Sequence, residues 1–198
     1  MAGRPREFDR DQALHKALVT FWQYGYEGTS MALLVNALGI ASARIYAAFG
    51  SKEQLFREVV ALYLAEQGGF TERVIQRSLP VSEAVQQILA DAITTYTAAD
   101  SPRGCLAVSS TASGGPDITA VLDWMSELRR QRTQSIIDLL QQAHGRGELK
   151  ADADPEALGD LFATLLHGIA IQARDGIAAP RLQAMIKPAL SALHGACA

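Results

Sequence analysis

Apolar residues recur every three or four positions over most of the chain, which is the pattern of amphipathic helices. The first such stretch contains Leu14, Leu18 and Phe21 and ends at Gly25. No segment alternates apolar and polar residues in the way that a half-buried strand does. The pattern therefore predicts an all-α fold of about nine helices.

Longer helices are expected in the second part of the chain. They begin after Pro80, near Ile118, after Pro155 and after Pro180. Proline suits the first turn of a helix, where its missing N–H leaves no hydrogen bond unmade. Pro188 lies inside the last helix and is expected to kink it, because its ring conflicts with the carbonyl group four residues earlier.

Residues 29–49 contain two short helices separated by a tight turn. Thr29 and Ser30 are candidate caps for the first helix, which Gly39 ends, and Ser42 is a candidate cap for the second. Two short helices joined through a glycine turn are typical of a helix-turn-helix. Such a unit can place the start of its second helix in the major groove of DNA.

The second helix of this pair carries residues suited to DNA contacts. Ser42 and Arg44 lie in its first turn, where an arginine can donate two hydrogen bonds to a guanine. Tyr46 and Lys52 are placed to contact phosphates, which fix the register of a protein on DNA without reading its sequence. A helical corner with no role in DNA binding has the same spacing and stays open as an alternative.

The distribution of charge along the chain gives modest support to a contact with nucleic acid. The 198-residue chain has a net charge of −3, but residues 1–60 hold seven basic and six acidic residues, and the rest holds eleven basic and fifteen acidic residues. Arg4 and Arg6 precede any acidic residue. They predict a basic arm that contacts phosphate or a groove, with a frayed terminus as the alternative.

Several other classes of protein are not expected. The 48% of hydrophobic residues is enough for a core, no apolar run is long enough to span a bilayer, and the charged N-terminus does not resemble a secretory signal. These features predict a cytoplasmic protein. The catalytic motifs G-x-S-x-G, the P-loop and G-x-G-x-x-G do not occur, so neither an enzyme nor a cofactor is expected.

The first third of the chain resembles the N-terminal domain of the TetR family of transcriptional regulators. The matching segments are Gly3-Arg4-Pro5-Arg6, Gly25-Tyr26-Glu27-Gly28-Thr29-Ser30, Leu38-Gly39-Ile40 and Ile45-Tyr46-Ala47-Ala48-Phe49-Gly50-Ser51-Lys52-Glu53-Gln54-Leu55-Phe56. The resemblance implies an N-terminal DNA-binding domain of three helices over residues 1–50. It also implies a larger helical ligand-binding and dimerisation domain over residues 51–198, entered by a connecting helix at about 52–67.

The resemblance implies a set of DNA contacts as well. These are Arg4, Arg6, Thr29, Ser30, Ser42, Ala43, Arg44, Tyr46 and Lys52. Many members of the family carry polar or aromatic contacts where this chain has Ala47 and Ala48. The first turn of the recognition helix is therefore expected to carry most of the base reading, with Arg44 as the main specificity residue.

The function implied is that of a repressor that a small-molecule inducer releases from its operator. Dimerisation is expected through helices at about 155–174 and 181–194, which form a four-helix bundle across a two-fold axis. A two-fold dimer predicts a palindromic operator on double-stranded DNA. Two alternatives stay open: an activator with the same DNA-binding domain, and a helical small-molecule-binding protein whose DNA-binding domain is vestigial.

Four residues are candidates for the ligand pocket: Cys105, Trp124, Phe162 and His167. Cys105 is interpreted as a redox or metal sensor or, alternatively, as a small buried hydrophobic residue. For Trp124, Phe162 and His167 the alternative interpretation is that they pack in the core.

The remaining clusters point to no further site. The four histidines do not fall at a metal-ligand spacing, and the two cysteines, 92 positions apart, form neither a disulfide framework nor a zinc site. No metal is therefore expected. The arginines at 129, 130 and 132 are interpreted as a solvated helix face.

Overall fold

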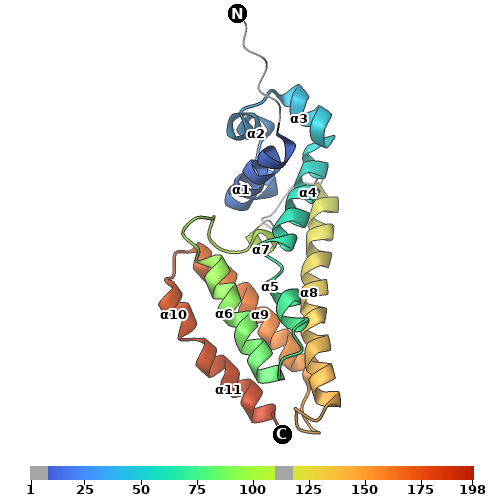
Figure 1. Ribbon diagram of the computed structural model, residues 1–198, viewed down its shortest axis with the longest axis vertical. Coiled ribbons are helices and arrows are strands. Elements are labelled where there is room, and N and C mark those ends of the chain that lie inside the picture. The colour runs from blue at the N-terminus through green and yellow to red at the C-terminus, as the bar shows by residue number, and fades with distance from the viewer. Residues whose placement is uncertain (1–8, 110–117) are drawn as a thin grey trace, which may run out of the picture.

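The computed structural model describes residues 9–109 and 118–198, and helices dominate both segments (Figure 1). The helices are α1 (Arg10–Gly28), α2 (Met31–Leu38), α3 (Ser42–Phe49), α4 (Lys52–Ala65), α5 (Phe70–Ile75), α6 (Val81–Tyr96), α7 (Leu106–Ser109), α8 (Thr119–Gly145), α9 (Pro155–Arg174), α10 (Ala179–Gln183) and α11 (Ile186–Ala196). The described residues contain no strand beyond one isolated bridge between Leu149 and Cys197. The predicted all-α class is therefore confirmed.

Side-chain caps begin three of the first four helices. Asp9, Ser30 and Ser51 each accept a hydrogen bond from the backbone N–H three residues later, at 2.9, 3.1 and 3.0 Å. A cap of this kind satisfies an N–H group that has no partner within the helix. The expected cap at Ser42 is wrong, because Ser42 is already helical and Ala41 precedes it without a side-chain hydrogen bond.

The C-terminal helix expected at 181–194 is divided into α10 and α11. Pro188 lies in the first turn of α11, and the residue four positions before it, Ala184, lies in the break between the two helices. The proline ring is incompatible with a helical carbonyl group at that position, so the helix restarts after it. Two further short helices, α5 and α7, have no apolar period long enough to reveal them in the sequence.

We refer to α1–α3 as the head. Its core is aromatic: the rings of Phe21 and Tyr26 pack against Phe56 of α4, with centroids 5.1 and 4.9 Å away. Tilted and edge-on ring contacts at this separation stabilise a core beyond the burial of their area. Lower on α4, Tyr63 packs edge-on against Trp22 of α1 at 4.8 Å. The first helix is therefore attached to α4 at two levels.

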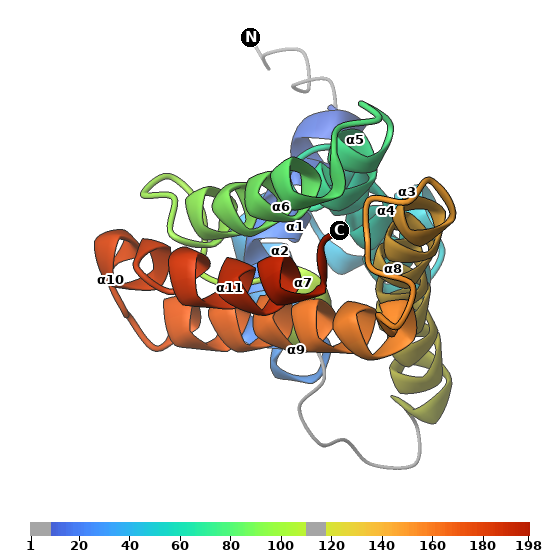
Figure 2. The same cartoon turned by 90° about the horizontal axis from the view of Figure 1, so that it is seen from below.

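The long axis of the molecule separates α3 at one end from α11 at the other (Figure 1). α4 leads from the head into the remaining helices, of which α6, α9 and α11 run side by side (Figure 2). Among the described residues no single helix is long and apolar enough to cross a membrane, and the bent pair α2–α3 meets that test only when both helices are counted together.

Candidate nucleic-acid interface

Helices α2 and α3 meet at an angle of 92° across the three-residue turn Gly39-Ile40-Ala41. Gly39 has φ +71° and donates its N–H to the Val35 carbonyl oxygen at 3.0 Å. A residue with a Cβ atom is disfavoured in this left-handed conformation. Ile40 is half-buried and packs against the core. The angle and the glycine turn are those of a helix-turn-helix.

The second helix of this unit has two different faces. Ile45 and Phe49 face the core and are 1% and 4% exposed. The opposite face is open to solvent and carries Ser42, Ala43, Arg44, Tyr46 and Ala47. Buried anchors fix the helix axis, while the exposed side presents a hydroxyl group, a guanidinium group and a phenol. These groups can donate hydrogen bonds to base edges and phosphates.

Arg10 holds α3 in place from the start of α1. Its guanidinium lies 4.5 Å from the centre of the Phe49 ring, and its Nε donates to the Ala48 carbonyl oxygen at 3.4 Å. Its Nη2 also donates to both carboxylate oxygens of Glu58 on α4 at 2.7 Å. Sequence reasoning missed this residue, because its partners lie 38 and 48 positions away and no local spacing connects them.

Lys52 is the first residue of α4, where the helix dipole favours an anion. Its ammonium group lies 4.4 Å from the centre of the Tyr26 ring. Burial lowers the pKa of Lys52, and Glu27 acts in the opposite direction. A cation that is held against a ring and only partly hydrated suits a fixed phosphate contact.

The two residues expected before α2 occupy different environments. Thr29 is fully buried and donates its hydroxyl to the Gly25 carbonyl oxygen at 2.6 Å, so its side chain belongs to the interior of the head. Ser30 is exposed, and its Oγ caps α2 by accepting from the Leu33 N–H. Arg4 and Arg6, also expected in the interface, lie outside the described residues.

The four expected pocket residues lie in different surroundings. Trp124 packs against Phe56 and lies under the Arg57 guanidinium, Phe162 is buried in α9, and Cys105 is fully buried before α7. His167 is half-buried, and burial followed by the charges of two arginines lowers its pKa. A cavity of about 200 Å³ lies nearby, lined by Leu64, Glu72, Ala107, Leu128, Arg129, Gln131, Arg132 and Ser135.

The arginine triplet of α8 does not form a solvated face. Arg130 is exposed and pairs with Glu127, but Arg132 is only 8% exposed. Successive helical residues are about 100° apart, so positions 130 and 132 point to different sides. Arg132 lies seven residues after Met125 and four before Ile136, both buried, so the apolar period itself marks it as an inward position. The expectation of a solvated face is wrong for Arg132.

No group of three or more histidine, cysteine, aspartate or glutamate side chains in the part of the chain that the structure describes could hold a metal ion.

Known proteins resemble this chain over most of its length. A family model described as "Bacterial regulatory proteins, tetR family" matches residues 13–59. The transcriptional repressor ComR of Escherichia coli K12 is 32% identical over 181 residues, which are 91% of this chain and 86% of ComR. The repressor BdcR of the same strain is 28% identical over 174 residues, which are 88% of this chain and 83% of BdcR.

A solved structure supports the same comparison. It is a cysteine mutant of the TetR family transcriptional regulator CifR, complexed with a 26-base-pair double-strand operator. It has a TM-score of 0.90 and 40% sequence identity to this chain, and the match covers 96% of this chain and 99% of CifR.

Proposed function

The chain belongs to the TetR family of bacterial transcriptional regulators, and on this premise we propose that it is a repressor that binds a palindromic operator as a homodimer. A small-molecule inducer releases the operator by favouring a conformer whose two heads are wrongly spaced for successive major grooves. The family is a class of DNA-binding transcriptional regulators, and the relatives ComR and BdcR are both transcriptional repressors.

The observation that carries this proposal is the exposed face of α3. Arg44 reads a base edge, Ser42 and Ala43 complete the contact with the bases, and Tyr46 and Lys52 contact phosphates. Ser30 contributes from the start of α2, and Arg4 and Arg6 from the segment before α1. Thr29 contributes indirectly, because its buried hydroxyl group closes the turn after Gly25.

The dimer interface is assigned to α9 together with α10 and α11. Leu161 and Ile171 are large apolar residues on α9 that remain 40% and 45% exposed. Gly168 lies between them, and a Cβ atom there would meet no other atom within 4 Å. An apolar stripe with a small residue at its centre suits close two-fold packing of helices.

The dimer can be tested with Ile171→Glu, which places a charge in the proposed interface. We expect sedimentation to show a dimer for the wild type and a monomer for this variant. The matched control is Val19→Glu on α1, a residue that is 49% exposed and lies outside the proposed interface. A dimer that survives Ile171→Glu would move the interface elsewhere.

The domain boundary is placed between Gly50 and Ser51, so that residues 1–50 bind DNA and residues 51–198 bind ligand and dimerise. Gly50 has φ +79° and Ser51 caps the helix that follows, which supports a division at this point. The ion pair of Arg10 with Glu58 links the head to the second turn of α4 across this boundary. The inducer is assigned to the cavity beside Arg132.

The experiment that tests this function is selection of bound sequences from a random duplex library with the full-length protein. We expect a palindromic motif, and affinity that falls steeply between low and physiological salt because phosphate contacts release counterions. Arg44→Ala is expected to relax the preference at one position of each half-site, at a cost of about 1–3 kcal/mol. The matched control is Arg77→Ala, an exposed arginine between α5 and α6.

Each alternative result of this experiment leads to a specific conclusion. An equal loss of affinity on all sequences would make Arg44 a phosphate contact, and no enriched motif would contradict the proposed function. A reporter gene placed behind the selected motif decides the sign of regulation. Higher expression without the protein supports a repressor, whereas lower expression supports an activator.

A further inference from the structure

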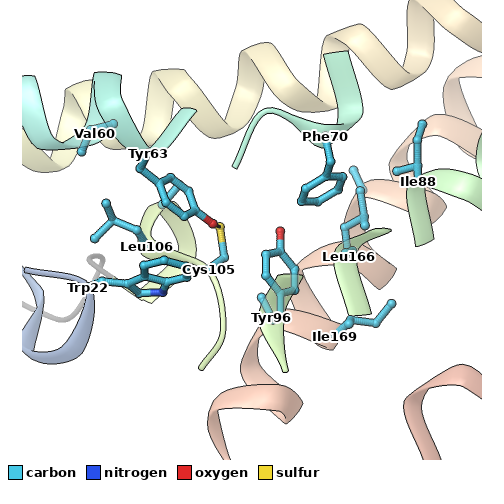
Figure 3. Packing of buried hydrophobic residues seen from close by; sticks show 14 of the residues in the cluster. Trp22, Val60, Tyr63, Phe70, Ile88, Tyr96, Cys105, Leu106, Leu166 and Ile169 are labelled. Atoms are coloured by element: carbon cyan, nitrogen blue, oxygen red, sulfur yellow. Dashed lines mark hydrogen bonds between the residues drawn. The ribbon is translucent and has the colours of Figure 1, made fainter. Parts of the chain in front are cut away.

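A group of polar side chains is buried where the head meets the helices below it. We define the Cys105 cluster as Cys105, Tyr63 of α4, Tyr96 of α6 and Arg132 of α8. Their residues are 0%, 0%, 1% and 8% exposed. Figure 3 shows Tyr63, Tyr96 and Cys105 converging from separate segments of the chain. Buried polar groups are costly unless they satisfy one another, so the arrangement around the sulfur atom is informative.

The groups around the sulfur atom of Cys105 are hydrogen-bond donors. Tyr63 donates its hydroxyl to the sulfur at 3.3 Å, Nη1 of Arg132 lies 3.8 Å from it, and the Tyr96 hydroxyl also bonds to it. Burial raises the pKa of both tyrosines well above the usual value, so both remain protonated. Burial also raises the pKa of the Cys105 thiol, but Arg132 and the two tyrosines outweigh that effect and bring the pKa below its usual value.

Arg132 needs an anion, and the sulfur is the group placed to supply it. Nη2 of Arg132 donates to the Gly68 carbonyl oxygen at 2.9 Å, and no carboxylate among the described residues lies within ion-pair distance of the guanidinium. A buried cation without a counter-charge is strongly unfavourable. Two further charged groups lie nearby. Glu72 raises the pKa of Arg132 after the larger contributions of Cys105, Tyr96 and Tyr63, and burial lowers the pKa of Arg129 while Cys105 raises it.

The Cys105 cluster is in direct contact with the head. Trp22 of α1 donates its Nε1–H to the carbonyl oxygen of Gly104 at 3.2 Å, and its ring packs against Tyr63. Gly104 has φ +82°, and a Cβ atom there would lie 2.8 Å from the Ala170 carbonyl oxygen. The backbone before Cys105 is therefore closely packed between α1 and α9, and a displacement of Cys105 reaches the first helix of the head.

We propose that Cys105 is held as a thiolate that a small hydroperoxide oxidises to a sulfenate, and that this modification releases the protein from its operator. The inference rests on the proposed DNA-binding function and names the chemical class of the effector. It also assigns a role to Arg132, which positions and stabilises the anion before and after the reaction.

The reaction is balanced without any other reagent. The thiolate sulfur attacks one oxygen of the hydroperoxide, an S–O bond forms, and the O–O bond breaks. With hydrogen peroxide, the leaving hydroxide takes the hydrogen of the newly bound oxygen, which gives a sulfenate and water. The sulfur loses two electrons and the peroxide gains them. The product keeps its negative charge and its pairing with Arg132, but it has an additional oxygen atom in a fully packed site.

The burial of the sulfur selects a small reagent. Cys105 has no exposed surface, and the cavity of about 200 Å³ is lined by Ala107 and Arg132, which are neighbours of Cys105 in the chain and in the cluster. Cys197 pairs through its backbone with Leu149, and the C-terminus beside it lies at the end of the molecule opposite the head (Figure 1). The two cysteines therefore cannot form a disulfide within this fold, and Cys197 serves as an internal reference thiol.

The test treats the folded full-length protein with hydrogen peroxide, removes the peroxide with catalase, and then unfolds the protein in a cyclic 1,3-dione, which traps sulfenic acid. The adduct is mapped by peptide mass spectrometry. In parallel, binding to the selected operator duplex is measured. We expect Cys105 to be trapped before Cys197, and peroxide to release the duplex from the wild type and from Cys197→Ser but not from Cys105→Ser. A folded protein in which Cys197 reacts first, or in which Cys105 does not react, overturns the proposal.

The role of Arg132 is tested by Arg132→Met and Arg132→Lys. We expect oxidation of Cys105 to slow on the order of three- to tenfold in Arg132→Met, because the rate follows the thiolate fraction, and to recover in Arg132→Lys. If Arg132→Met does not fold, the proposal is tested by the pH dependence of the oxidation rate in the wild type. The rate at Cys105 should level off at a pH below the usual thiol pKa of about 8.5, and a rate that still rises above that pH overturns the proposal.

The two parts of the inference can fail separately. A protein that binds no duplex before treatment contradicts the proposed function, while the trapping experiment still decides the chemistry of Cys105. A protein that binds its duplex and is oxidised at Cys105 without release refutes the regulatory role alone.

Discussion

The outer face of α3 and the Cys105 cluster use polar side chains in opposite environments. On α3 the polar groups are exposed, and their positions come from apolar anchors on the other side of the helix, Ile45 and Phe49. In the Cys105 cluster the polar groups are themselves the buried contacts. If Arg44 loses a hydrogen-bond partner, water can take its place. If Arg132 loses one, bulk water cannot reach its buried site to replace it.

This difference indicates how the two regions respond to change. A polar substitution on α3 should alter DNA binding and leave the fold intact, because surface substitutions away from caps and core cost little stability. A change in the Cys105 cluster should affect both stability and the position of the head, because Tyr63 and Gly104 also contact Trp22. An effector that acts at the cluster thereby reaches the DNA-binding surface through packed contacts rather than through solvent.

The largest effect is expected for Phe56→Ala in the aromatic core of the head. Phe56 is fully buried and contacts the rings of Phe21, Tyr26 and Trp124. Its removal should lower the free energy of unfolding by about 3–5 kcal/mol, measured by urea denaturation. The control Val19→Ala, at an exposed position, should change it by less than about 0.5 kcal/mol. A small effect of Phe56→Ala would mean that apolar anchors do not define the head.

The second-largest effect is expected for Arg10→Met, which tests the positioning of α3 separately from the stability of the fold. Arg10→Met removes the contacts of Arg10 with Phe49, Ala48 and Glu58. The pair with Glu58 is exposed on both sides, so unfolding should change by less than about 1 kcal/mol. Operator affinity should fall on the order of five- to tenfold, about 1–1.4 kcal/mol, because α3 is less firmly held. Unchanged affinity in a binding titration would remove Arg10 from the machinery that orients α3.

The head could be predicted from the sequence because its signals are local. Caps such as Ser30 and Ser51, together with the turn at Gly39, lie within a few residues of the helices that they define. The angle between α2 and α3 follows from that turn. The proposed base contacts follow in the same way, since one face of a short helix is fixed once its buried positions are known.

The Cys105 cluster could not be predicted in this way. Cys105 is 42 positions from Tyr63 and 27 from Arg132, and each residue alone has an ordinary interpretation. Only the packing of the segment at α7 against α4 and α8 brings them together. The burial of Thr29 could not be predicted from the sequence for a related reason. The direction in which its hydroxyl group points depends on the kink at Gly25.

The pKa values of His167 and His15 are shifted in opposite directions, which sharpens the comparison between buried and exposed polar groups. Burial, followed by the charges of Arg132 and Arg129, lowers the pKa of His167. The folded protein therefore favours the neutral ring, and the associated stability is present above the unfolded pKa of about 6.5 and lost as the pH falls below it. We expect urea denaturation between pH 7.5 and 5.5 to show a loss of less than about 1 kcal/mol in the wild type that His167→Gln lacks, given partial screening by solvent. Equal pH dependence in both proteins would place His167 away from those charges.

The smallest effect is expected at His15, on the surface of the head. Its Nδ1 lies 2.9 Å from the Asp11 carbonyl oxygen and its Nε2 lies 3.1 Å from Oε1 of Glu66. The backbone hydrogen bond to Asp11 and then the bond to Glu66 raise its pKa. The folded state favours the protonated ring, so this stability is fully present below about pH 6.5 and is lost as the pH rises through the folded pKa. His15→Gln should therefore be less stable than the wild type at pH 5.5, by at most about 0.5 kcal/mol at so exposed a site, and equally stable at pH 8. Glu66→Gln should weaken this pH dependence, because it removes the charged partner, and a wild type whose advantage grows toward pH 8 would reverse the sign assigned to His15.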